Sequence, residues 1–364
     1  MNRIAIIGIA VVASLVVAAF AFLSLPALQR PLLLAAMERA IGVDRDALYA
    51  DDALRVIVCG AGSPFPDRER AEPCFAVIAG GRMILIDIGS RSWSSLARMP
   101  VRAERLEAVF LTHYHSDHIA DLPIANMQSW AEGRAQPLRV HGGPGIERVV
   151  GGFNEAYAPD NSYRSGHHGP SFMRPENGRM VPALIANPDG SPLTGDQTAV
   201  AYDDGALRIT AFAVEHPPVV PAYGFRVDYK GRSVVFSGDT HLTPSVGLNA
   251  RGADVLIHEA VDKELIQALG SAASRAGRDR VAQIMTDIQT YHATPAEAAA
   301  VAREAGVKLL VLNHMVPPIP SWMGDAFVLR DIPADAPEVK VAFDGLLITL
   351  PLGSDAVETR RIAN

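Results

Sequence analysis

The feature that most constrains the fold is a dense cluster of metal-binding residue types in one short stretch. Three histidines and one aspartate lie within six consecutive positions: His113, His115, Asp117 and His118. Residues 107–112 before them form an apolar run typical of a buried strand, and residues 119–130 after them have apolar positions at helical spacing. Because α/β folds place their sites where strands end, the pattern predicts an α/β protein with a site at this turn.

Imidazole and carboxylate groups at this density favour a divalent metal ion such as zinc. His113 and His115 alternate along extended backbone, so both can point the same way. Asp117 and His118 follow on the turn and point elsewhere, which could serve a second ion. A polar loop with solvated histidines is the alternative, but this spacing is too specific for it.

Other acids and histidines also come directly after apolar, strand-like runs. They are Asp87, His216, Asp239, Glu259 and His314. Random scatter would not place so many polar groups at strand ends. We therefore expect them to converge on one edge of two packed sheets.

The central motif resembles the metal-binding motif of metallo-β-lactamase-fold hydrolases. The resemblance covers about residues 54–350 and implies an αββα sandwich. Three later motifs are similar to those of ribonuclease Z and the related zinc arylsulfatases and phosphodiesterases. They are Gly238-Asp239-Thr240, Ile257-His258-Glu259-Ala260 and Tyr291-His292-Ala293-Thr294, the last with Ala293 where serine is usual.

This resemblance implies two divalent metal ions, zinc in the first place, although iron or manganese suits similar ligands. One ion would take His113, His115, His216 and Asp239. The other would take Asp117, His118, Asp239 and His314. Asp87 would support the metal histidines, and His141 is the rival of His216 for the third-histidine role.

The resemblance also implies a mechanism. A hydroxide that bridges the two ions would be the nucleophile, and the ions would stabilise charge on phosphorus or sulfur. His292, oriented by Glu259, would be the general acid. The predicted catalytic residues are thus Asp117, His292 and Glu259.

The N-terminal segment is long and apolar. Residues 4–25 carry no charge, and a segment of this length can span a bilayer as a helix. The single Arg3 before them favours a cytoplasmic N-terminus and an exported remainder. We expect a signal anchor over residues 1–28, with a cleavable signal peptide as the alternative. The remaining predicted parts are a tether (29–53), a hydrolase domain (54–350) with a cap insertion (158–206), and a C-terminal tail (351–364).

Cys59 and Cys74 are the two cysteines of the chain. In an oxidising compartment they can form a disulfide, and two buried thiols are the equal alternative. Neither fits a zinc pattern.

Composition and spacing favour a small substrate. The net charge of −7 argues against a broad nucleic-acid surface, and only residues 217–238 separate His216 from Asp239, too few for the basic arm of ribonuclease Z. We therefore expect a hydrolase of small phosphodiester or sulfate esters, anchored in the inner membrane with its catalytic domain in the periplasm or outside the cell, or else secreted after signal cleavage. Nucleic acid is predicted to be an improbable partner, and a homodimer is compatible with the fold.

Two alternatives follow from the same residues. The first is a ribonuclease Z-type tRNA 3′-processing endonuclease with a cytoplasmic catalytic domain. The second, from another class, is a membrane-tethered binding protein that keeps the fold without turnover.

Overall fold

The computed structural model describes residues 3–362, and the chain divides into two compact units, Met1–Ala47 and Leu48–Asn364. The first unit consists of α1 (Arg3–Ser24) and α2 (Pro26–Ile41). Within α1, Ile6–Ser24 has a mean hydropathy of 2.8, so the helix is long and apolar enough to cross a membrane. A signal sequence has the same length and composition, so the helix alone does not separate the two predictions.

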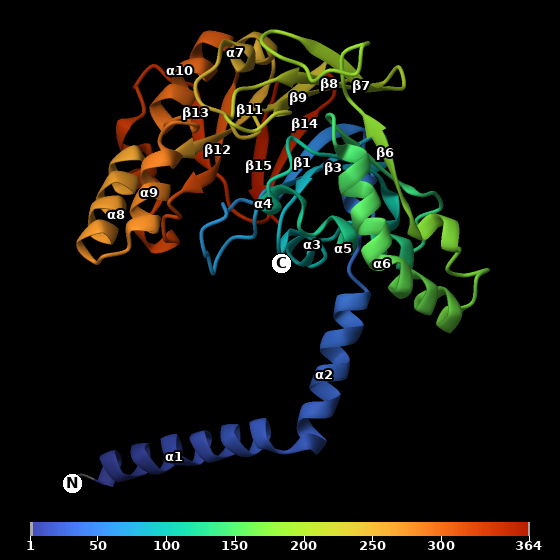
Figure 1. The fold of residues 1–364 in the computed structure, drawn as a ribbon. Helices are drawn as coiled ribbons and strands as arrows, with labels where there is room; N and C mark the ends of the chain where they lie inside the picture. The colour runs from blue at the N-terminus through green and yellow to red at the C-terminus, as the bar shows by residue number, and fades with distance from the viewer. Residues whose placement is uncertain (1–2, 363–364) are drawn as a thin grey trace. The chain divides into compact units, whose positions relative to one another are not determined.

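The second unit is built on two sheets, and Figure 1 shows helices on the outer side of each. The strands among the described residues form one sheet of eight and one of seven. The first sheet has the order β15 (Glu358–Arg361), β14 (Leu346–Pro351), β1 (Ala53–Gly60), β2 (Cys74–Ala79), β3 (Arg82–Ile88), β4 (Leu106–Phe110), β5 (Leu138–Gly142), β6 (Met180–Leu184). The second has the order β13 (Glu338–Val341), β12 (Leu309–Val316), β11 (Val255–Val261), β10 (Arg232–Phe236), β9 (Tyr223–Tyr229), β8 (Leu207–Ala213), β7 (Thr198–Asp203).

Alternation along the strands explains the layered core. In β1, Val56 and Val58 belong to the apolar cluster between the sheets, whereas Ile57 and Cys59 belong to the cluster under the helices of the first sheet. Successive side chains of a strand point to opposite faces, so a strand that is apolar at every position is buried on both. The predicted αββα sandwich is confirmed.

Helices cover the outer faces. The first sheet is covered by α3 (Ser92–Leu96), α5 (Leu122–Ala131) and α6 (Ile146–His168), and the second by α7 (Pro244–Ala250) and α10 (Pro295–Ala305). The start of α10 follows from its sequence, because Thr294 and Glu297 form a capping box and Pro295 occupies the first turn. Two further helices, α8 (Lys263–Arg275) and α9 (Asp279–Ile288), form a hairpin between β11 and α10.

Two predicted segments have different structures. Residues 158–206, expected to form a cap, contain the second half of α6 and the edge strands β6 and β7. Residues 351–364, expected to form a tail, contain β15, which pairs with β14. Edge strands pair on one side only and keep a solvated face, so they lack the apolar run that identifies a central strand.

Cys59 and Cys74 form a disulfide between the neighbouring strands β1 and β2, with the two Cα atoms 5.0 Å apart. The structure therefore has the first of the two arrangements that the sequence left open.

Candidate metal centre

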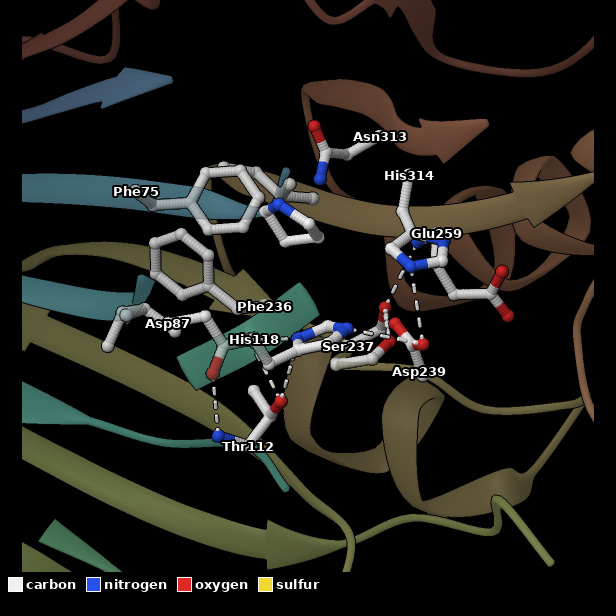
Figure 2. A pocket seen from close by; sticks show the side chains of 14 residues that line it. Phe75, Asp87, Thr112, His118, Phe236, Ser237, Asp239, Glu259, Asn313 and His314 are labelled. Carbon is white, nitrogen blue, oxygen red and sulfur yellow. Dashed lines mark hydrogen bonds and ion pairs between the residues drawn. The ribbon is translucent and has the colours of Figure 1, made fainter. Parts of the chain in front are cut away.

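Strand ends bring the predicted residues to one edge of the sandwich. Asp87 ends β3, and the motif 112–118 follows β4 and enters the short helix α4 (Ser116–Ile119). From the second sheet, Glu259 lies in β11 and His314 in β12, and His216 and Asp239 follow β8 and β10. Figure 2 shows Asp87, His118, Asp239, Glu259 and His314 around one pocket. The expected convergence is therefore present.

A first group of potential metal ligands combines both sheets. Its members are His113, His115, His216 and Asp239, whose ligand atoms all lie within 4.8 Å of one another. The Nε2 atoms of His113 and His216 are each 4.0 Å from the Asp239 Oδ2. His115 is exposed and the other three residues are buried, so this group opens towards solvent on one side.

A second group lies next to the same aspartate. Asp117, His118 and His314 have their ligand atoms within 4.8 Å of one another. The Asp239 Oδ2 lies 3.4 Å from the Nε2 atoms of both His118 and His314. Asp239 thus lies between the two groups. A third overlapping group of Asp239, His292 and His314 meets the same criterion.

Asp87 fixes the orientation of the motif from behind. Its Oδ1 accepts the Thr112 amide at 2.8 Å, and its Oδ2 lies 2.8 Å from both the Thr112 hydroxyl and the His118 Nδ1. The contact with Nδ1 turns the Nε2 of His118 towards Asp117 and Asp239. A carboxylate behind a histidine in this way fixes its tautomer and ring orientation in metal sites.

The backbone is strained where these side chains leave their strands. Asp87 and His314 have φ values of 55° and 51°, a left-handed conformation that is uncommon outside glycine. Gly89 comes two residues after Asp87, and a Cβ at Gly89 would lie 1.9 Å from the Asp117 carbonyl oxygen. The close approach of the β3 end to the metal motif therefore requires glycine at position 89.

The electrostatic field of the cluster suits a cation. Burial opposes charge on His118, but Asp239, Asp117 and Asp87 raise its pKa well above the usual value. Burial likewise opposes charge on His314, yet Asp239 and Asp117 raise its pKa to about 9. Burial favours the neutral form of Asp239, but His314 and His118 hold its pKa well below the usual range. The carboxylates therefore dominate the field at His118 and His314, whereas burial and the neighbouring His118 hold the pKa of His113 well below its usual value.

The donor set fits a divalent metal ion. The His118 Nε2, which faces Asp117 and Asp239, is buried and has no hydrogen-bond partner among the described residues, which is costly unless another group satisfies it. Imidazole nitrogens with carboxylate oxygens are the ligands that zinc prefers. Asp117, predicted as catalytic, belongs to this cluster, because its Oδ2 is 3.2 Å from the His314 Nε2 and 3.4 Å from the His118 Nε2.

His292 and Glu259 form a buried pair beside the cluster. The His292 Nδ1 lies 3.0 Å from the Glu259 Oε2, and the Ala293 amide donates to the Oε1 at 2.9 Å. The His292 ring centroid is 5.2 Å from that of His216 and 5.6 Å from that of His314. Because Glu259 binds one ring nitrogen, the other is left for proton transfer.

His141 lies outside the three ligand groups. Its ring stacks on Phe110, with the centroids 4.3 Å apart. The structure thus brings His216, rather than its rival, to the cluster.

A cleft of about 370 Å³ opens directly over the cluster. Its polar floor contains His115, Asp117, His216, Asp239, His292 and His314, and its walls contain Pro64, Phe65, Pro66, Ile284, Ile288, Tyr291 and Val316. These wall residues were not predicted from the sequence. The available signal was the helical spacing of Val281, Ile284, Met285 and Ile288, which gives α9 an apolar face.

Comparison with known proteins agrees with this geometry. Residues 82–315 match the family described as beta-lactamase superfamily domain. The ribonuclease Z of Mycobacterium marinum is 35% identical over 269 residues, which are 73% of this chain and 88% of that protein. The ribonuclease Z of Mycobacterium bovis is also 35% identical, over 73% and 87% of the two chains.

Solved structures share the fold. Human tRNase Z, short form, has a TM-score of 0.58 and 22% identity, over 82% of this chain and all of the human chain. The metallo-beta-lactamase fold protein YhfI from Bacillus subtilis has a TM-score of 0.55 and 22% identity, over 82% of this chain and all of that one.

These matches define a metal-dependent hydrolase of the metallo-β-lactamase fold. Within that superfamily the chain belongs to the ribonuclease Z family, as the matches over most of the mycobacterial proteins show.

The relatives overturn two predictions. The expected function, an exported hydrolase of small phosphodiester or sulfate esters, is wrong. The prediction that nucleic acid is an improbable partner is also wrong. Both are contradicted because the relatives are named ribonuclease Z and a structural neighbour is named tRNase Z. The physical reason is that net charge describes the whole molecule, whereas a substrate meets the local field of its site. The short segment 217–238, which lacks room for the basic arm of ribonuclease Z, also did not justify excluding a tRNA substrate.

Proposed function

We propose that this protein is a metal-dependent endonuclease that hydrolyses an RNA phosphodiester at the 3′ side of tRNA precursors. The names of the relatives, at 35% identity over 88% of the Mycobacterium marinum protein, support this substrate. The observation that carries the proposal is the pair of ligand groups that meet at Asp239, which belongs to the first and lies 3.4 Å from two histidines of the second. Phosphodiester hydrolysis is commonly assisted by two ions held close together.

The ligand assignment follows the two groups. One zinc ion would be held by His113, His115, His216 and Asp239, and the other by Asp117, His118, Asp239 and His314. When bound, two such ions activate water and stabilise the charge that develops on the phosphoryl oxygens.

The neighbouring pair handles the proton. His292 donates a proton to the departing 3′ oxygen of the upstream nucleotide. Glu259 accepts from the His292 Nδ1, which keeps the ring in place and stabilises its charged form. The buried Ala293 amide and the Ser237 hydroxyl hold the Glu259 residue in turn, at 2.9 and 3.2 Å.

Helix α1 is proposed to anchor the protein in the inner membrane. Because tRNA precursors are made in the cytoplasm, the catalytic unit is proposed to face the cytoplasm. This orientation is opposite to the one that Arg3 indicates, and the Cys59–Cys74 disulfide also favours an oxidising compartment.

The direct test uses the full chain, purified in detergent and loaded with zinc. A tRNA precursor with a labelled 5′ end and a 3′ trailer should give one shorter labelled product, and a chelator should abolish it. The same tRNA with a mature 3′ end is the matched control and should stay intact. Zinc-loaded protein that leaves the precursor uncut would contradict the proposal.

A further inference from the structure

The walls of the cleft over the metal centre are apolar, although its floor is charged. Phe65 extends from the loop after β1, and Ile284 and Ile288 come from α9. No lysine or arginine lines this cleft among the described residues. The walls therefore offer no partner for a second phosphate, and the phosphodiester must meet the protein at the floor.

The helical hairpin is fixed to the strands that carry the site. Ile266 of α8 and Met285 and Ile288 of α9 pack with Val261 of β11 and Val316 of β12 in one buried cluster. β11 also carries Glu259, and β12 carries His314. The apolar wall is thus packed on the two strands that carry Glu259 and His314.

The hairpin is also packed closely within itself. A Cβ at Gly270 of α8 would lie 3.1 Å from the Met285 Cβ, so a glycine lets the two helices approach. Yet Ile284, on the cleft side of α9, remains 51% exposed. A large apolar side chain left open beside a catalytic floor suits contact with a ligand.

We propose that Phe65, Ile284, Ile288 and Tyr291 bind the base of the nucleotide whose 3′ oxygen departs. The inference rests on the proposed function and assigns the part of the substrate that this wall recognises. Tyr291 precedes His292, with the ring centroids 4.9 Å apart, so the wall adjoins the group that protonates that oxygen. A cleft of about 370 Å³ has room for a base, and bases pack on aromatic and apolar side chains whatever their sequence.

The test compares three precursor RNAs with zinc-loaded full chain in detergent. One is intact, one lacks only the base of the nucleotide with the departing oxygen, and one lacks only the base on the other side of the cleaved bond. Loss of the first base should lower kcat/KM by about tenfold, which is the scale of one base stacked on a protein surface. Loss of the other base should have little effect.

Protein variants test whether the wall residues bind that base. In the double variant Phe65→Ala with Ile284→Ser, the penalty for removing the base should largely disappear. Leu269→Ser is the matched control, because Leu269 is an exposed residue of the same hairpin outside the cleft, and it should keep the wild-type penalty.

Two results would overturn the inference in distinguishable ways. Equal cleavage of the intact and the first abasic RNA by the wild-type protein would overturn the base-binding wall alone. No cleavage of intact RNA would overturn the proposed function, and the wall with it.

Discussion

Asp239 is the residue at which the contacts of the site meet. One of its oxygens lies within 4.0 Å of a nitrogen of four histidines: His113, His118, His216 and His314. It is buried, and in the proposed assignment it would be a ligand of both ions. A change at Asp239 should therefore affect both ions together.

His292 should matter for the departure of the leaving group and not for metal binding. We expect His292→Ala to lower cleavage of ordinary RNA by about 10²–10⁴-fold, the usual contribution of a general acid. RNA with sulfur in place of the departing 3′ oxygen needs little protonation, so the variant should cleave it almost as fast as the wild type. Single-turnover rates on both substrates measure this difference.

Metal content is the control for that experiment, because His292 also lies in a third possible ligand group with Asp239 and His314. The variant should keep the wild-type metal content. Equal losses on the oxygen and sulfur substrates would refute the acid role.

The residues of the site were predictable because each one follows an apolar strand or lies in a short motif. His113 to His118 and His314 could be located in this way, and the structure brings them together. Phe65 and Ile284 were not predictable as parts of the site. Their side chains bear no reactive group, and the contact between their loop and α9 exists only in the folded chain.

At the scale of elements, β10, β11 and β12 carry the site at their carboxyl ends. At their opposite ends, side chains bind the same strands to one another. Asp254, just before β11, accepts Arg232 at 3.0 Å through both of its oxygens, and it also accepts the Lys308 ammonium at 2.9 Å and the Ser233 amide at 3.0 Å. These contacts join the starts of β10, β11 and β12. They should stabilise the sheet without contacting the metal cluster.

Asp254→Asn should lower the free energy of unfolding by about 1.5–3 kcal/mol near neutral pH, because the buried Arg232 loses its charged acceptor and keeps only backbone carbonyls. Burial opposes charge on Asp254, but Arg232 and Lys308 hold its pKa below the usual value. A depressed carboxyl pKa stabilises the fold above about pH 4 and loses this effect as the pH falls through the folded-state pKa. The difference between variant and wild type should therefore shrink in acid.

Urea unfolding at neutral and acidic pH measures this effect. Asp203→Asn is the matched control, because Asp203 pairs with Arg208 at an exposed position and should have little effect. A variant as stable as the wild type at neutral pH would contradict the role of Asp254.

The central strands were predictable and the edges were not. β1 to β4 and β10 to β12 have apolar runs that identify them in the sequence. In contrast, β15 has the sequence Glu-Thr-Arg-Arg and is a strand only because β14 offers an open edge. A polar strand of this kind is determined by its neighbour rather than by its own residues.

At the scale of the whole molecule, an acidic chain is proposed to act on a polyanion. The net charge is −7, yet the groups that would meet the phosphate are two metal ions held by buried residues. Local positive charge at the floor of the cleft can outweigh a distant negative surface, because salt screens exposed charges within about 10 Å.

The membrane proposal gives a prediction for the whole chain. The full chain should stay in the membrane fraction after alkaline carbonate extraction, and a variant that begins at Leu48 should be soluble. Green fluorescent protein at the C-terminus should fluoresce, because the catalytic unit is proposed to face the cytoplasm. Active alkaline phosphatase at the same position would instead place the unit outside the cytoplasm.

The most direct test of metal-dependent tRNA processing is a zinc titration of metal-free full chain, with bound metal and cleavage of a tRNA precursor measured in the same samples. We predict that cleavage appears as the second ion binds, and that Asp239→Asn binds less metal and loses cleavage. Cleavage that does not depend on bound metal, or protein with two bound ions that leaves the precursor intact, would contradict it.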